Sequence, residues 1–257
     1  MENEMTKEKL VELLENYLWR ITRANDCLQV YKTIVNAKQT RLNEMEYACS
    51  FFSIAEDSIC NDLAMTTAKL FDEGNTMSIK KLINICNQNR DCFLSEAIIK
   101  YQWADAKDKG MAPYRECFPI NIDSDIKKAY AELETLQPKI DNLKTRRDKY
   151  YAHSDKKYVF EPNTLQNDAP LSFNDVEGLL DFAGKVCNNF LYNITRRRFI
   201  PHTYDNNDLM NLLDRLHDCE SNDAETSQKH QGRMSRAENC YEIVSMSFKG
   251  ADKPAFT

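Results

Sequence analysis

Arg147 and His153 are the two residues of this 257-residue chain whose types and spacing best suit chemistry on a phosphate ester. A histidine exchanges a proton near neutral pH, and a guanidinium stays charged and can bind two phosphate oxygens at once. Cleavage of RNA needs a proton taken from a 2′-hydroxyl, a proton given to the leaving oxygen, and positive charge on the phosphorane between them. The pair therefore suits RNA cleavage with no metal ion and no other cofactor.

The residues before Arg147 predict that its side chain lies on the inward stripe of a helix. Apolar residues precede it at intervals of seven, at Ile126, Leu133 and Ile140. Arg146 competes for the same role, because at about 100° per residue Arg146 and His153 are within about 20° of each other on an unbroken helix. Arg147 and His153 are then about 120° apart. A helix that ends near His153 favours Arg147, which we take as catalytic, with Arg146 in support.

A structural explanation of Arg147 competes with the catalytic one. Glu56 occupies an apolar stripe of its own helix, so the two residues could form a buried ion pair. Alternatively, Glu56 turns toward solvent or pairs locally. His153 could interact with the dipole at a helix end.

The pattern of the whole chain predicts an all-α fold. Only six glycines and seven prolines are present, and apolar residues recur at intervals of three and four. A loop is expected between Pro162 and Pro170, and a kink rather than a break at Pro138. We expect helices at about 7–37, 42–70, 78–88, 91–103, 125–152, 172–199 and 206–219. Thr6 is the expected cap of the first helix, and Asp123-Ser124 the expected cap of the helix that carries Arg147.

Composition and charge exclude several classes of protein. A net charge of -6 argues against a protein that coats DNA, so nucleic-acid contacts must be local. No apolar run reaches the ~20 residues of a membrane span, and nine scattered cysteines with no secretory leader indicate a reduced, cytoplasmic chain. The histidines show no metal-ligand spacing, and no phosphate-binding glycine loop is present. Arg196, Arg197 and Arg198 form a basic run for which a solvated face is at least as good an explanation as a binding patch.

The segment Arg147-Asp148-Lys149-Tyr150-Tyr151-Ala152-His153 resembles the motif of the HEPN superfamily, in which an arginine and a polar residue precede a histidine near the end of an inner helix. Phe51-Phe52, the segment from Leu63 to Asp72, and Ser78 to Leu82 are similar to the abortive-infection branch of the U type. The resemblance implies an up-and-down bundle of long antiparallel helices at residues 1–204. Residues 205–257 would form a C-terminal extension with a short helix and a partly flexible tail.

The resemblance also implies an endoribonuclease of the toxin type, used in phage defence or growth arrest, with its active site at a homodimer cleft. Arg147 and His153 would be catalytic. The auxiliary residues would be Arg146, Asp148, Tyr151, Ser154, Asp155 and Glu56, and RNA would be bound by Lys144, Lys149, Lys156 and Lys157. The apolar tail at 241–248 could bind an antitoxin or another partner protein. The alternative is a non-catalytic helical module that binds RNA, a nucleotide or a partner protein.

Overall fold

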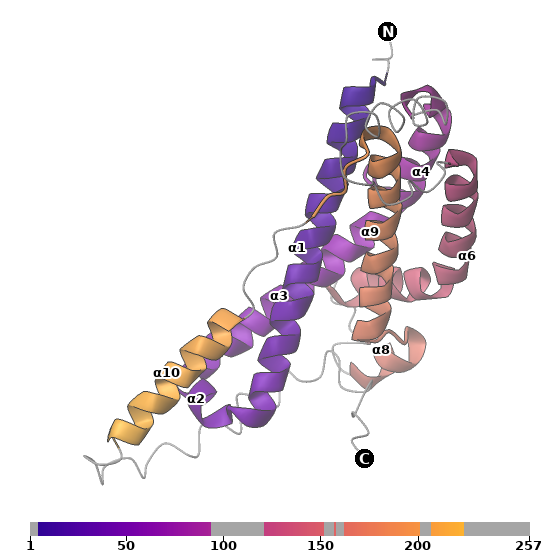
Figure 1. The fold of residues 1–257 in the computed structure, drawn as a ribbon. Helices are drawn as coiled ribbons and strands as arrows, with labels where there is room; N and C mark the ends of the chain where they lie inside the picture. The colour runs from indigo at the N-terminus through magenta and orange to yellow at the C-terminus, as the bar shows by residue number, and fades with distance from the viewer. Residues whose placement is uncertain (1–4, 94–120, 152–156, 158–161, 201–206, 224–257) are drawn as a thin grey trace, which may run out of the picture. The chain divides into compact units, whose positions relative to one another are not determined.

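A computed structural model describes residues 5–93, 121–151, 157, 162–200 and 207–223, and within these ranges the chain forms helices joined by turns, as expected (Figure 1). The elements are α1 (Lys7–Thr40), α2 (Leu42–Glu46), α3 (Cys49–Phe71), α4 (Ile79–Gln88), the 3₁₀-helix η1 (Arg90–Cys92), α6 (Ile122–Arg146), the π-helix η2 (Arg147–Tyr151), α8 (Pro162–Asp168), α9 (Phe173–Thr195) and α10 (Asn207–Asp223). Within the described ranges, no helix combines the length and hydropathy needed to cross a lipid bilayer.

The chain divides into two compact units, and the long helices α1, α3, α6 and α9 contribute to both. The first unit comprises Met1–Ile21, Lys69–Gln137 and Asp181–Pro201, and the second comprises Thr22–Ala68, Pro138–Leu180 and His202–Thr257. α6 passes through Pro138 without a break in the helix, so the expected continuity is confirmed.

In the first unit, buried apolar side chains lie on α1, α4, α6 and α9. α4 begins at the cap residue Ser78, whose hydroxyl accepts from the backbone N–H of Lys81 at 3.3 Å. The Tyr17 hydroxyl on α1 donates to the Ser78 carbonyl at 3.1 Å, which joins α1 to the start of α4. Phe93 and Phe190 meet edge to face with ring centroids 6.2 Å apart.

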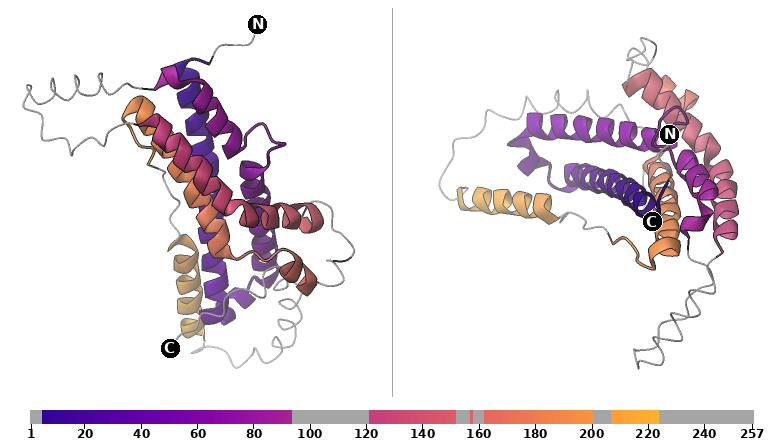
Figure 2. Two further views of the ribbon diagram at one scale, coloured as in Figure 1. Left: turned by 90° about the vertical axis from the view of Figure 1, so that its right-hand side faces the viewer. Right: turned by 90° about the horizontal axis from the view of Figure 1, so that it is seen from above.

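In the second unit, α10 packs on the C-terminal part of α1 and on α2 and α3 (Figure 2). A buried cluster joins these helices and consists of Ile34, Ala37, Met45, Phe52 and Leu213. Apolar side chains on four helices thus lose contact with water together, which stabilises the position of α10 in this unit.

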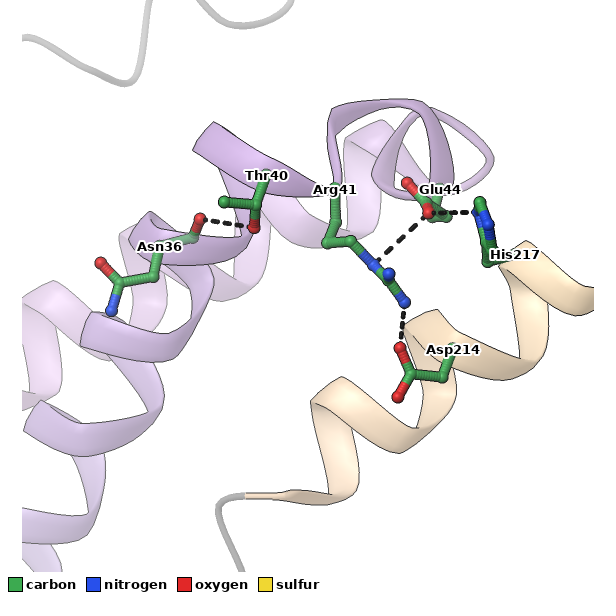
Figure 3. Close-up of polar contacts among 6 residues, drawn as sticks. All are labelled: Asn36, Thr40, Arg41, Glu44, Asp214 and His217. Atoms are coloured by element: carbon green, nitrogen blue, oxygen red, sulfur yellow. Dashed lines mark hydrogen bonds and ion pairs between the residues drawn. The ribbon is translucent and has the colours of Figure 1, made fainter.

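Charged side chains join α10 to α2 and to the residue before it (Figure 3). Arg41 forms an ion pair with Asp214, and its Nε lies 3.4 Å from Oε1 of Glu44. The Nδ1 of His217 lies 3.0 Å from the same oxygen of Glu44. The buried Glu44 carboxylate therefore faces both the arginine before α2 and the histidine on α10.

Several expected boundaries were wrong. The expected helix at 42–70 is broken at Tyr47 and Ala48. In the short helix before the break, Glu44 is buried and Leu42 is 43% exposed. The expected loop after Pro162 is helix α8: proline suits the first turn of a helix, and Leu165 and Ala169, four positions apart, share a buried face. The helix expected at 91–103 is described only for the 3₁₀ turn η1, and its remainder lies outside the described residues.

Candidate active site

The proposed catalytic arginine begins a change of helix type. α6 ends at Arg146, and Arg147–Tyr151 continue as the π-helix η2. A π-helix makes wider turns than an α-helix, so angles counted at about 100° per residue do not apply beyond Arg147. Short π-helical segments occur often at functional sites. His153 lies outside the described residues, as do Ser154, Asp155 and Lys156, and Tyr151 is placed only as the last residue of η2.

Arg146 is buried against the segment that joins α8 to α9. Arg146 is 1% exposed. Its Nε donates to the carbonyl of Ala169 at 2.7 Å, and its Nη2 donates to Oε1 of Gln166. Arg147 was expected to be the inward arginine, but Arg146 is the more deeply buried of the two. The spacing of seven describes only one face of α6. The segment around Ala169 covers the side of the helix next to that face, where Arg146 lies.

The segment that holds Arg146 is itself fixed by side chains of α6. Asn142 donates from Nδ2 to the carbonyl of Pro170 at 2.8 Å, and Lys139 pairs with Asp175 at 2.7 Å. Ser172 and Asp175 form a reciprocal cap at the start of α9, with the Ser172 N–H donating to the carboxylate and the Asp175 N–H donating to the hydroxyl. Burial alone would raise the pKa of Asp175, but the hydrogen bonds from Lys139 and Ser172 hold that pKa below its usual value.

Arg147 contacts the residue that follows it. Its Nε lies 2.6 Å from Oδ1 of Asp148, and the two side chains are 17% and 48% exposed. A charge-assisted hydrogen bond of this length fixes the orientation of the guanidinium plane. The contact uses Nε, one of the three guanidinium nitrogens. A polar residue directly after the arginine thus has a physical role in orienting it.

The described lysines of the proposed RNA surface are not equivalent. Lys149 is exposed on η2, and Lys144 is partly buried on α6. Lys157 is exposed and its Nζ lies 2.6 Å from Oδ2 of Asp168 at the end of α8. Lys157 would have to give up this ion pair to bind a phosphate. The ion pair is a weak competitor, because exposed ion pairs contribute little in water.

Glu56 pairs with Lys38 on α1, so the possible ion pair between Glu56 and Arg147 is not the one that forms. The Glu56 side chain is 6% exposed and contacts Lys38 from the last turns of α1, whose side chain is 18% exposed. Glu56 also does not turn toward solvent. The apolar stripe on α3 correctly predicted burial, but the partner lies on another helix, and the spacing within one helix carries no signal for it.

The thiols and metal-ligating groups add no further candidate centre. Among the described residues, no group of three or more His, Cys, Asp or Glu side chains is arranged to hold a metal ion. Six cysteines in the described ranges are free thiols, and burial raises the pKa of Cys60 and of Cys86 to about 12. Thiolates are the reactive form of cysteine, so these two buried thiols are inert at neutral pH.

Comparison with known proteins identifies the family of the chain. Neither the curated proteins nor the solved structures include a match. The model of the family described as AbiU2, of the HEPN class, matches residues 7–215. The match covers α1 to α9, includes both arginines of the candidate site, and extends into the first part of α10. The chain belongs to the AbiU2 family of HEPN proteins.

Proposed function

We propose that this protein is a metal-independent endoribonuclease that acts in phage defence or growth arrest, with Arg147 and His153 as its catalytic residues. The observation that carries the assignment to Arg147 is the difference between the two adjacent arginines. Arg146 is 1% exposed and is hydrogen-bonded to Ala169 and Gln166, so it serves to hold the fold. Arg147 begins the π-helix beside a polar residue, which matches the order of the family motif.

The proposed reaction is an internal displacement at phosphorus. The 2′-oxygen of the ribose attacks the adjacent phosphate, and its proton passes to the imidazole of His153. The 5′-oxygen of the next nucleotide leaves with a proton supplied by an acid, so the products are a 2′,3′-cyclic phosphate and a 5′-hydroxyl. Arg147 stabilises the additional negative charge on the phosphorane. An oriented guanidinium at this position lowers the activation barrier of the cleavage step.

A homodimer supplies the groups that a single motif lacks. One copy of the chain carries a single His153 and a single Arg147 in the motif, whereas the reaction uses a base and an acid. Two motifs that face each other across a cleft provide two imidazoles, one for each proton transfer. Lys144, Lys149, Lys156 and Lys157 would bind phosphates of the RNA on either side of the scissile bond. The tail at 241–248 would bind an antitoxin or another regulatory protein.

The assay uses purified full-length protein, single-stranded RNA and excess EDTA. The wild type is expected to leave cyclic-phosphate ends. His153→Ala should lower kcat/KM by about 10² to 10⁴, as expected for loss of a general acid or base. Arg147→Ala should lower it by about 10² to 10³, as expected for loss of transition-state charge stabilisation.

Arg215→Ala provides the matched control, because Arg215 is exposed on α10. Circular dichroism must show that each variant remains folded. Specific activity should also fall on dilution as the dimer dissociates. If the folded wild type never cuts RNA, or if both motif variants cut at the control rate, the catalytic proposal is wrong. Full specific activity in a strict monomer would contradict the composite cleft.

A further inference from the structure

The first unit contains a pocket between the start of α1 and the end of α9. Its volume is about 570 Å³, and its walls come from the first turns of α1, the last turn of α9 and the segment up to Ile200. This segment runs back along the N-terminal part of α1 (Figure 1). Phe199 in the segment meets Trp19 of α1 edge to face, with ring centroids 5.1 Å apart. The volume lies within the range of small-molecule sites, which is about 300 to 1,000 Å³.

The charge of the pocket is strongly positive although the whole chain is acidic. Lys7, Arg196, Arg197 and Arg198 line it, and Glu15 is the acidic residue among its described walls. Four positive charges against one negative charge leave an excess of three. The N-terminus of α1, which carries a partial positive charge, also lies at this wall. A concave site with this charge attracts an anion.

Arg196 has the features of a residue held ready for a ligand. Its φ is 61°, the left-handed region in which a side chain other than that of glycine is strained. Both Nη1 and Nη2 are buried, and neither has a hydrogen-bond partner among the described residues. Its Cζ lies 5.0 Å from the centre of the Tyr192 ring, and Cζ of Arg198 lies 5.6 Å from the same ring centre. Two guanidinium groups therefore converge on one aromatic ring.

The end of α9 explains the backbone of Arg196 but not its side chain. The Arg196 N–H donates to the Tyr192 carbonyl at 2.9 Å, which is the ordinary way for a helix to end in a left-handed residue. Glycine suits that position without strain. Stacking on Tyr192 offsets part of the cost of burying the guanidinium, but it satisfies none of the N–H donors. An anion that reaches these nitrogens would satisfy them, and it would offset the positive charge that Arg196 and Arg198 bring to one ring.

The remaining walls indicate the rest of the ligand. Val11, Leu191 and Phe199 also line the pocket, and they add apolar surface to its basic groups. An inorganic ion would leave this surface unused, whereas a nucleobase or a similar flat ring would cover it. Guanidinium groups match the oxygens of a phosphate in geometry as well as in charge. We propose that this pocket binds an organic phosphate of mononucleotide size, with the phosphate on Arg196 and Arg198 and the ring against the apolar wall.

Calorimetric titration of the full-length protein tests the proposal, with the four nucleoside monophosphates, inorganic phosphate and unphosphorylated nucleosides as probes. At least one monophosphate should bind the wild type more tightly than phosphate alone or its own nucleoside. Arg196→Gly is the decisive variant, since it removes the guanidinium and relieves the left-handed strain. It should weaken binding of that monophosphate at least about tenfold, because one charge-assisted contact is lost, while the melting temperature of the free protein stays equal or rises.

Arg20→Ala is the matched control, because Arg20 is exposed on α1 and does not line the pocket. It should bind the monophosphate as the wild type does. The proposal is overturned if no monophosphate binds, if Arg196→Gly binds as well as the wild type, or if inorganic phosphate binds as tightly as every monophosphate. Binding of oligoribonucleotides alone would also overturn it. RNA cleavage by the same samples is a separate readout, so failure of this site and failure of the proposed catalysis are distinguishable.

Discussion

Arg146 donates from Nε to the main-chain carbonyl of Ala169 at 2.7 Å, and this contact separates the roles of two arginines that are neighbours in the chain. The same guanidinium also reaches Gln166 at the end of α8. Arg146 thus joins α6 to the segment between α8 and α9. Arg147 follows at the first position of the π-helix and contacts Asp148. The first arginine stabilises the fold, and the second is the one proposed for chemistry.

Substituting the two arginines should therefore have opposite consequences. Arg146→Ala leaves the buried carbonyl of Ala169 without its donor, and we expect a loss of about 2 to 3 kcal/mol in the free energy of unfolding. Arg147→Ala removes a partly exposed contact and should cost less than about 1 kcal/mol. Urea unfolding followed by circular dichroism measures both values. Equal losses in the two variants would contradict this assignment.

Patterns within one element were the part of the fold that could be predicted from sequence. The intervals of apolar residues correctly indicated α1, α4 and α9 to within a few residues. The expected cap at Thr6 is confirmed, since its hydroxyl accepts from the Lys9 N–H at 3.3 Å. The start of α6 was expected after Asp123-Ser124, but the helix begins at Ile122. Asn121 and not Ser124 caps it, since Oδ1 of Asn121 accepts from the Ser124 N–H at 2.9 Å. Caps compete locally, and several polar residues here suit the position.

Relationships between elements were not predictable in the same way. Lys38 was not identified as the partner of Glu56, because a periodic pattern shows that a residue is buried but not which helix faces it. The polar composition of α8 hid a short helix that buries Leu165, and Ala169 is buried directly after its end. That short helix also decides the environment of Arg146. The choice between Arg146 and Arg147 therefore depended on α8, a helix that the sequence pattern did not reveal.

The buried pair of Lys38 and Glu56 predicts a strong coupling between the two positions. Lys38→Met leaves a carboxylate that is only 6% exposed without this partner, and we expect a loss of about 3 to 5 kcal/mol in unfolding free energy. The double variant Lys38→Met with Glu56→Leu should recover most of that loss, because a well-packed apolar pair can replace a buried ion pair. Additive losses in a double-mutant cycle would refute the coupling.

The cap of α9 predicts a dependence of stability on acid pH. The folded pKa of Asp175 lies below the ordinary value of 3.8, so its carboxylate stabilises the fold at neutral pH. That contribution should decrease as the pH falls from about 5 and should be lost below the folded pKa, where the carboxyl is protonated in both states. Asp175→Asn should therefore be less stable than the wild type at neutral pH, with a difference that narrows in acid.

Asp181→Asn is the matched control for the cap, because Asp181 is an exposed carboxylate on the same helix. Its effect on stability at neutral pH should be small. Thermal unfolding of the three proteins across the acid range gives the comparison. A gap between wild type and Asp175→Asn that stays constant with pH would show that the carboxylate contributes through packing and not through its charge.

The cluster around Leu213 predicts that α10 is needed for the stability of the second unit. Leu213 is 0% exposed and packs with Ile34, Ala37, Met45 and Phe52, and the family match extends to residue 215. Leu213→Ala should cost about 2 to 5 kcal/mol, as expected for a large-to-small change in a core. Leu212→Ala should change stability by less than about 1 kcal/mol, because Leu212 is 49% exposed on the same turn of α10.

Truncation after residue 204 extends the comparison to the whole of α10, because the expected domain boundary placed that helix in a separate extension. Removing α10 exposes the apolar side chains of α1, α2 and α3 that contact Leu213. It also removes Asp214 and His217, which contact Arg41 and Glu44. The truncated chain should therefore lose more stability than Leu213→Ala and should aggregate at lower concentration. Chemical unfolding and light scattering measure the two effects. A truncated chain as stable and as soluble as the full protein would mean that α10 is an independent extension and that its packing contributes little to the unit.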